Sequence, residues 1–286
     1  MERSLSKNEA KVVLDLEWRG QTTVTLGELR QALGASESYA RFFAHKLVQK
    51  GWLERLRPGL FRLVPAARGR EGVADANPLA AGAVLVAPYF FSFGTACTYH
   101  GLTEQVFAEV YIACQERRRP VVVRGKRNVF VEVPQERFFG FTEQTVLGEP
   151  VQIATLERAL LDAVDRPQHA GGLGEVSRIV SRAASRISWT ALLDLARRWQ
   201  AAAVLQRLGC LLDLHRAEVP ADARSELVAL TQGASKIQLG PRAKWGYAGK
   251  LMQPWNVVEN APRDVLVSSV DQGRRRVVFR PKGAGP

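Results

Sequence analysis

Cysteine is scarce in this sequence, with three among 286 residues. Cys97, Cys114 and Cys210 are an odd number at unrelated spacings, which excludes the disulfide framework of a small secreted protein and is typical of a reducing cytoplasm. His100 follows Cys97 at a gap seen in zinc sites, but no second pair of ligands at zinc spacing accompanies them. We therefore interpret the two as a buried cysteine and a core histidine, and we predict no metal site.

Long hydrophobic runs are also missing. The longest candidate, residues 79–93, is interrupted by Gly82 and Pro88 and is shorter than the roughly 20 residues that span a bilayer. No apolar region follows Met1, so the sequence predicts no signal peptide. We expect a cytoplasmic protein with no membrane partner.

The common signatures of enzyme sites are absent as well. The sequence has neither a phosphate-binding glycine loop ending in Lys-Ser or Lys-Thr nor a Gly-x-Ser-x-Gly elbow. A metal-dependent nuclease would place an acid-x-Lys triplet on a strand, but the triplet Glu9-Ala10-Lys11 lies in a predicted helix. The glycines at 171–174 precede a helix and are interpreted as its start, in preference to an anion cradle. We predict no catalytic residue and no cofactor.

Acidic residues are outnumbered, because 28 Asp and Glu stand against 40 Lys and Arg, a formal net charge of +12. Such an excess favours an anionic partner such as nucleic acid, although it carries no information on the fold. A chain of 286 residues is long enough for one large or two medium domains with hydrophobic cores.

A helix-turn-helix pattern lies near the N-terminus. Thr25 and Glu28 have the spacing of a capping box at the start of a first helix, which Gly34 ends. Ser36 can cap a second helix, which Gly51 ends. Two amphipathic helices joined by so short a turn are typical of a helix-turn-helix. Apolar residues recur along one side of each helix: Leu26, Leu29 and Leu33 on the first, and Tyr39, Phe43 and Leu47 on the second.

A hairpin follows directly, which makes the pattern that of a winged helix. Residues 52–56 and 60–64 alternate like strands on either side of Pro58-Gly59, and a capped helix at 6–19 would complete the core. A Pro-Gly pair fits a type II turn, whose twist matches a hairpin poorly, so we expect a loop longer than two residues. The alternative is a small helical subdomain with an ordinary charged face. For a double-stranded DNA partner, the predicted contact residues are Ser36, Ser38, Tyr39, Arg41, His45, Lys46, Gln49, Arg55, Arg57 and Arg62.

The remaining chain predicts an α+β fold behind a linker. We expect a winged helix-turn-helix domain at 1–66, a linker at 67–78 and a larger mixed α/β domain at 79–286. Strands are expected at 110–114, 120–124, 129–133, 138–141, 151–154, 236–239, 264–268 and 276–279. Helices are expected at 95–99, 155–166, 173–186, 189–199, 201–216 and 222–231, whereas 79–86 fits either a helix or a buried strand, and 282–286 is expected to be a frayed tail.

Three stretches carry a family pattern: TLERALLDAVDRP at 155–167, with HAGG at 169–172 behind it, TACTYHGLT at 95–103, and LRPGLFRL at 56–63. They resemble the AbiEi antitoxin family of type IV toxin–antitoxin systems, although the family more often has a basic residue where Pro58 stands. The resemblance spans nearly the whole chain. It implies an N-terminal domain that binds inverted repeats upstream of its own operon and represses it. It also implies a C-terminal domain that counteracts a nucleotidyltransferase toxin, often without a stable complex, and we expect a monomer in solution or weak self-association on DNA.

The motif at 155–167 also has a purely structural interpretation. Arg158 and Asp162 are four residues apart on one helix face and can pair, while Glu157 favours the positive end of the helix dipole. The alternative is direct contact with the toxin. The motif residues concerned are Thr155, Glu157, Arg158, Asp162, Asp165 and Arg166.

Two other functions remain open at the level of sequence. The first is a nucleic-acid-processing enzyme that uses the winged helix for targeting, and the missing catalytic signatures disfavour it. The second is a one-component transcription regulator whose second domain senses a small ligand.

Overall fold

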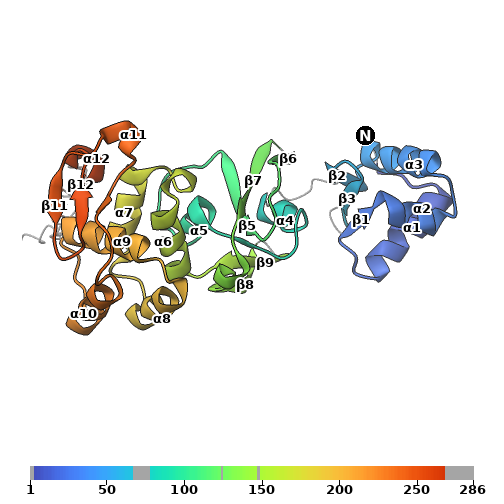
Figure 1. Cartoon of the computed structure of the whole chain (residues 1–286). Helices are drawn as coiled ribbons and strands as arrows, with labels where there is room; N and C mark the ends of the chain where they lie inside the picture. Colours follow the sequence, from blue (N-terminus) through green and yellow to red (C-terminus); the bar gives the residue numbers. More distant parts are fainter. Residues whose placement is uncertain (1–2, 67–77, 124, 147–148, 268–286) are drawn as a thin grey trace, which may run out of the picture.

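A computed structural model gives the structure of the chain and describes residues 3–66, 78–123, 125–146 and 149–267. Two parts lie side by side in Figure 1, a small one at the N-terminal end and a larger one built from the rest of the chain. Most of the predicted linker, the predicted strand at 276–279 and the predicted tail at 282–286 lie outside the described residues.

The N-terminal part is a winged helix-turn-helix. Two reciprocal capping boxes begin its first two helices, Ser6 with Glu9 and Thr25 with Glu28, as their spacing predicts. Gly34 ends the second helix with a φ of +57°, a left-handed conformation that glycine adopts without strain. The elements are α1 (Lys7–Trp18), β1 (Thr23–Thr25), α2 (Leu26–Leu33), α3 (Glu37–Gln49), β2 (Leu53–Arg57) and β3 (Leu60–Leu63).

The hairpin of the wing is tighter than the sequence predicts. Arg57 pairs with Leu60, so only Pro58 and Gly59 form the turn, and the φ of Gly59 is +76°, as the third position of a type II turn requires. The register shifts between Arg55 and Arg57, so a bulge supplies the extra local twist that the turn lacks. The predicted longer loop is therefore wrong. The sheet order is β1-β3-β2, and β1 is a strand that the sequence analysis missed.

Both faces of the wing sheet are covered. Leu53, Phe61 and Leu63 point into the core of the N-terminal part, as strand alternation requires. The opposite face carries Leu56 and Leu60, which belong to a separate apolar cluster with Ala81, Leu85 and Val123 of the larger part. Because the larger part packs on this second face, every residue of β3 is buried. Figure 1 shows β2 and β3 turned toward the larger part.

A six-stranded mixed sheet in the order β6-β7-β5-β4-β9-β8 forms the side of the larger part that faces the wing. The pairs β5–β7 and β4–β9 are parallel and the other pairs are antiparallel. Its elements are α4 (Pro78–Ala83), β4 (Tyr89–Phe91), α5 (Phe93–Tyr99), β5 (Glu109–Cys114), β6 (Val121–Val123), β7 (Lys126–Glu132), a short 3-10 turn at Gln135–Arg137, β8 (Phe141–Val146) and β9 (Glu149–Ala154).

A helical layer follows the sheet, with α6 at its centre, in contact with α5, α7, α8 and α9. A small sheet in the order β10-β12-β11 closes the far end. Gly209 in α9 lies against the ring of Trp255, and an added Cβ would clash with that ring. The elements are α6 (Leu156–Asp165), a 3-10 turn at Pro167–His169, α7 (Leu173–Ala183), α8 (Trp189–Trp199), α9 (Ala202–Leu214), α10 (Ala221–Leu230), β10 (Ile237–Gln238), α11 (Arg242–Trp245), β11 (Lys250–Met252), β12 (Val257–Glu259) and α12 (Arg263–Leu266).

The predicted α+β class agrees with this architecture, and two strand assignments are wrong. Residues 264–268 were expected to be a strand, but Pro262 precedes the short helix α12 there, because proline is favoured at helix starts. The strand expected at 138–141 begins only at Phe141, since a 3-10 turn occupies the preceding residues. The ambiguous stretch at 79–86 contains the helix α4.

Candidate nucleic-acid interface

The outer face of α3 is polar and exposed. Ala40, Phe43, Ala44 and Leu47 face the core, so the opposite side of the helix is left to solvent. The predicted residues on that side are all exposed: Ser36, Ser38, Tyr39, Arg41, His45, Lys46 and Gln49. Tyr39 was also placed on the apolar side by the spacing, but it is 45% exposed at the flank of the helix.

Ser36 has a structural task in addition. Its side chain accepts a hydrogen bond from the backbone N–H of Tyr39 and so caps α3. The cap orients the first turn of the helix, which is the part of a recognition helix that reads base edges.

Arg41 is held in place by its own helix. Its Nη2 lies 2.6 Å from Oε1 of Glu37, one turn earlier, and both side chains are more than half exposed. Exposed pairs at this spacing are worth only a few tenths of a kcal/mol to about 0.5 kcal/mol. A phosphate or a guanine can therefore replace Glu37 as the partner of Arg41 at small cost.

A groove of about 470 Å³ separates α3 from the wing. Its rim carries Arg41 and His45 from the helix and Arg55 from β2, with Pro58 and Gly59 at the turn. Its remaining lining is apolar: Leu26, Val48 and Phe61. Arg57 is exposed beside the same turn. Helix and wing thus present two arginines, Arg41 and Arg55, toward one concave surface, an arrangement that matches a phosphate backbone beside a major groove.

Phe42 is a surface residue that the sequence analysis missed. It is 53% exposed, in the middle of the outer face of α3, and Nζ of Lys46 lies 4.7 Å from the centre of its ring. A sequence signal existed, because Phe42 and Phe43 are adjacent and two neighbouring helical residues point about 100° apart. Phe43 shares the core side of α3 with Ala40 and Leu47, which leaves Phe42 on the outer side.

Arg62 does not belong to this surface, which corrects its assignment as a DNA contact. It shares a face of β3 with Leu60, and that face is covered by the larger part. Its side chain is 7% exposed, and its Nη2 lies 2.5 Å from Oε1 of Glu149 in β9. The alternation of the strand predicts on which face of the sheet Arg62 lies, but it does not predict that the larger part covers that face.

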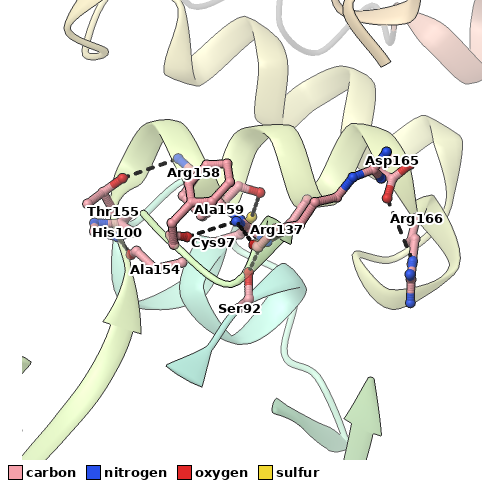
Figure 2. Close-up of polar contacts among 12 residues, drawn as sticks. Ser92, Cys97, His100, Arg137, Ala154, Thr155, Arg158, Ala159, Asp165 and Arg166 are labelled. Carbon is pink, nitrogen blue, oxygen red and sulfur yellow. Dashed lines mark hydrogen bonds and ion pairs between the residues drawn. The ribbon is translucent and has the colours of Figure 1, made fainter. Parts of the chain in front are cut away.

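The motif at the start of α6 forms a buried network instead of a surface. Arg158 is fully buried, and its guanidinium donates to both carboxylate oxygens of Asp162 at 2.9 and 3.1 Å. Its Nη1 donates to the carbonyls of Arg137 and Phe139, and Ser92 donates to Asp162. Figure 2 shows Ser92, Arg137 and Arg158 gathered against one side of α6. A buried charge is tolerated only when paired in this way.

Aromatic rings enclose the same guanidinium. Its central carbon lies 4.2 Å from the ring centre of Trp199, and the rings of Phe90 and Phe139 lie just over 5 Å away. The arrangement ties the sheet, α6 and α8 together. Arg158 and Asp162 therefore stabilise the larger part and are inaccessible to a partner protein.

The other motif residues also have intramolecular partners, and none is exposed. Thr155 caps α6 by accepting from the N–H of Arg158, and Glu157 accepts from the N–H of Ser188 at the start of α8. At the other end, which Figure 2 also shows, Arg166 lies 3.7 Å from Asp165 and donates to a backbone carbonyl of β7. Burial raises the pKa of Asp165, and Arg166 opposes that rise.

Cys97 and His100 do not converge on a common site. Nε2 of His100 lies 2.7 Å from the carbonyl of Ala154, and it must be the donor because a carbonyl only accepts. The thiol of Cys97 is buried and points to the carbonyl of Ala159. Burial raises the pKa of Cys97, which keeps the thiol protonated. Within the described ranges, no three His, Cys, Asp or Glu side chains are grouped as metal ligands would be.

Comparison with known families found a match, and it lies in the N-terminal part. Residues 11–64 match the model of the AbiEi antitoxin family of transcriptional regulators. The matched range runs from α1 to the end of the wing, so it coincides with the winged helix and includes the groove beside α3. DNA binding, transcription regulation and antitoxin action are the functions attached to this AbiEi family.

The larger part of the chain lies outside the matched range. No curated protein matches the sequence significantly. One solved structure, described as the crystal structure of RV2827C protein from Mycobacterium tuberculosis, superimposes with a TM-score of 0.56 over 90% of this chain and 92% of that chain. The identity is 15%, so the likeness shows a shared fold and no more. Among the described residues, no helix is both long and apolar enough to cross a membrane.

Proposed function

We propose that this protein is a DNA-binding autorepressor and antitoxin that counteracts a nucleotidyltransferase toxin. The observation that carries the proposal is the AbiEi family match, which falls on the element whose recognition helix and wing share a basic groove. The likeness of 95–103 and 155–167 to the same family extends the proposal to the larger part.

The DNA partner is an inverted repeat in the promoter of its own operon. Base contacts come from the outer face of α3, and phosphate contacts come from the wing. We propose domains at 1–66 and 79–286, joined by the linker at 67–78, in a cytoplasmic protein that is monomeric or weakly self-associating. Two copies on neighbouring half-sites supply the affinity that one small module lacks. With Arg62 removed, the contact residues proposed are Ser36, Ser38, Tyr39, Arg41, His45, Lys46, Gln49, Arg55 and Arg57.

The antitoxin activity belongs to the larger part. The α6 motif acts there by holding the fold, since Arg158 and Asp162 are buried. Any surface that meets the toxin, or competes with it for a substrate, must therefore lie elsewhere on this part. A stable complex with the toxin is not required by the proposal.

The proposed DNA binding is tested with the full-length protein and the DNA upstream of its gene. The proposed surface carries four cations, Arg41, Lys46, Arg55 and Arg57, so the slope of log K against log salt should be roughly −3 to −4 per bound monomer. The upstream duplex should bind more tightly than a random duplex of the same length. A slope near zero, or equal affinity for both duplexes, would remove the repressor proposal.

The antitoxin half is tested by growth rescue. The full-length protein, driven from a foreign promoter, should protect cells that express a nucleotidyltransferase encoded next to its gene. A variant with Arg41→Ala and Arg57→Ala should still rescue but should lose repression of its own promoter. Loss of both activities together in that variant would contradict the separation of functions.

A further inference from the structure

Phe42 stands out on the recognition helix because it is an exposed aromatic ring in a polar surrounding. Its helical neighbours one turn away are Ser38, Tyr39, His45 and Lys46, all exposed. None of the core clusters formed by the described residues includes Phe42. The core of the N-terminal part is already supplied by Phe43, so folding gives no reason for a second ring here.

Two side chains of the same helix restrict the ring. The ring centre of Tyr39 lies 6.4 Å from that of Phe42, and Nζ of Lys46 lies over the Phe42 ring, 4.7 Å from its centre. A side chain that is fixed before binding loses little conformational entropy when it meets a ligand. Phe42 is therefore suited to a defined contact.

The charges around the Phe42 ring indicate which kind of partner contacts it. If Phe42 were the centre of a protein–protein interface, further apolar side chains would be expected around it, because the cores of such interfaces are depleted in charge. The surroundings of Phe42 are polar and cationic instead, with Arg41, His45 and Lys46 exposed on the same helix. That combination suits the major groove, where apolar contact is available only at the 5-methyl group of thymine.

We propose that Phe42 reads thymine, by packing its ring against the 5-methyl group of one base in each half-site. The proposal rests on the DNA-binding function proposed above and adds a base preference to it. Neighbouring polar side chains, such as Gln49 and Arg41, hydrogen-bond to adjacent base edges. The contact adds affinity at one position only, because guanine, adenine and cytosine present no methyl group there.

The test uses full-length protein and a site selected from random duplexes. Each thymine of the selected half-site is replaced in turn by deoxyuridine, which removes the methyl group and changes nothing else. Binding is followed by fluorescence anisotropy at one fixed salt concentration. For the wild-type protein, one replacement should weaken binding about fourfold, the effect of exposing one methyl-sized group.

Substitutions of Phe42 then test whether its ring contacts that methyl group. In Phe42→Ala the ratio between thymine and deoxyuridine should fall to about one at the same position, whereas Phe42→Leu should keep part of it. Leu14→Ala is the matched control, because Leu14 is another exposed apolar residue (57%) but lies on α1. It should keep the wild-type ratio. Circular dichroism confirms that each variant is folded.

Two results would overturn the inference. The first is an unchanged ratio of binding between thymine and deoxyuridine in Phe42→Ala, which would show that another residue contacts the methyl group. The second is a wild-type protein that binds its site with no methyl dependence at any thymine. A wild-type protein that selects no site at all would reject the proposed function together with the inference, and so is distinguishable from both.

Discussion

Arg62 of the wing and Glu149 of the large sheet form an ion pair, with 2.5 Å between Nη2 and Oε1. Beside it, Leu56 and Leu60 pack against apolar residues of α4 and β6. Among the described residues, the hairpin of the winged helix therefore contacts the larger part through both apolar and charged side chains.

Glu149→Ala should destabilise the protein by about 1–3 kcal/mol, because it leaves the buried guanidinium of Arg62 without its carboxylate. The measurement is the midpoint of urea unfolding at pH 7. Asp15→Ala is the matched control, since it breaks the exposed Arg19–Asp15 pair and should cost less than about 1 kcal/mol. Equal effects of the two substitutions would show that the contact between the two parts is weak in solution.

Arg158→Met should destabilise the protein by about 3–5 kcal/mol, because Asp162 would remain buried as an unpaired charge. Adding Asp162→Leu should recover part of that loss, since it removes the isolated carboxylate. Arg19→Met breaks a pair of the same spacing on the surface and serves as the control. Thermal unfolding followed by circular dichroism measures all three. A fully stable Arg158→Met protein would contradict a structural role for the motif.

Arg41→Ala should weaken binding to the operator by about 1–3 kcal/mol and relax the base preference at one position. Arg57→Ala should weaken operator and random duplex about equally, since a phosphate contact carries no base information. A gel-shift comparison of the two duplexes measures both effects. If Arg41→Ala reduced binding equally on both duplexes, Arg41 would be a phosphate contact and not a base reader.

Glu9 should make the winged helix sensitive to acid. Burial by itself raises the pKa of Glu9, but hydrogen bonds from Lys50 and Ser6 outweigh it and hold that pKa below the ordinary value of 4.5. A carboxyl whose pKa is lower in the folded state stabilises the protein above the unfolded pKa and loses that contribution as the pH falls through the folded pKa.

The free energy of unfolding should therefore drop below about pH 4.5, and Glu9→Gln should show a smaller drop between pH 7 and pH 4. Urea titrations at the two pH values measure the difference. An equal drop in both proteins would assign the acid sensitivity to other carboxyl groups.

Local interactions account for what could be predicted from the sequence. The capping boxes at Ser6 and Thr25, the glycine stop at Gly34 and the pairing of Arg158 with Asp162 depend on residues three or four positions apart. Such contacts form wherever the local helix forms. The sequence by itself therefore determined the winged helix, the α+β class and most of the outer face of α3.

Only the tertiary structure decided which predicted surfaces remain surfaces. Periodicity assigns Arg62 to one side of a strand and Arg158 to one side of a helix, but it does not say what covers that side. Glu149 is 87 residues from Arg62 in the chain, and Trp199 closes over Arg158 from another helix. Phe42 is the converse case, since its apolar side chain suggests the core and the packing of Phe43 leaves it outside. Burial depends on contacts between distant segments, and a local pattern cannot encode them.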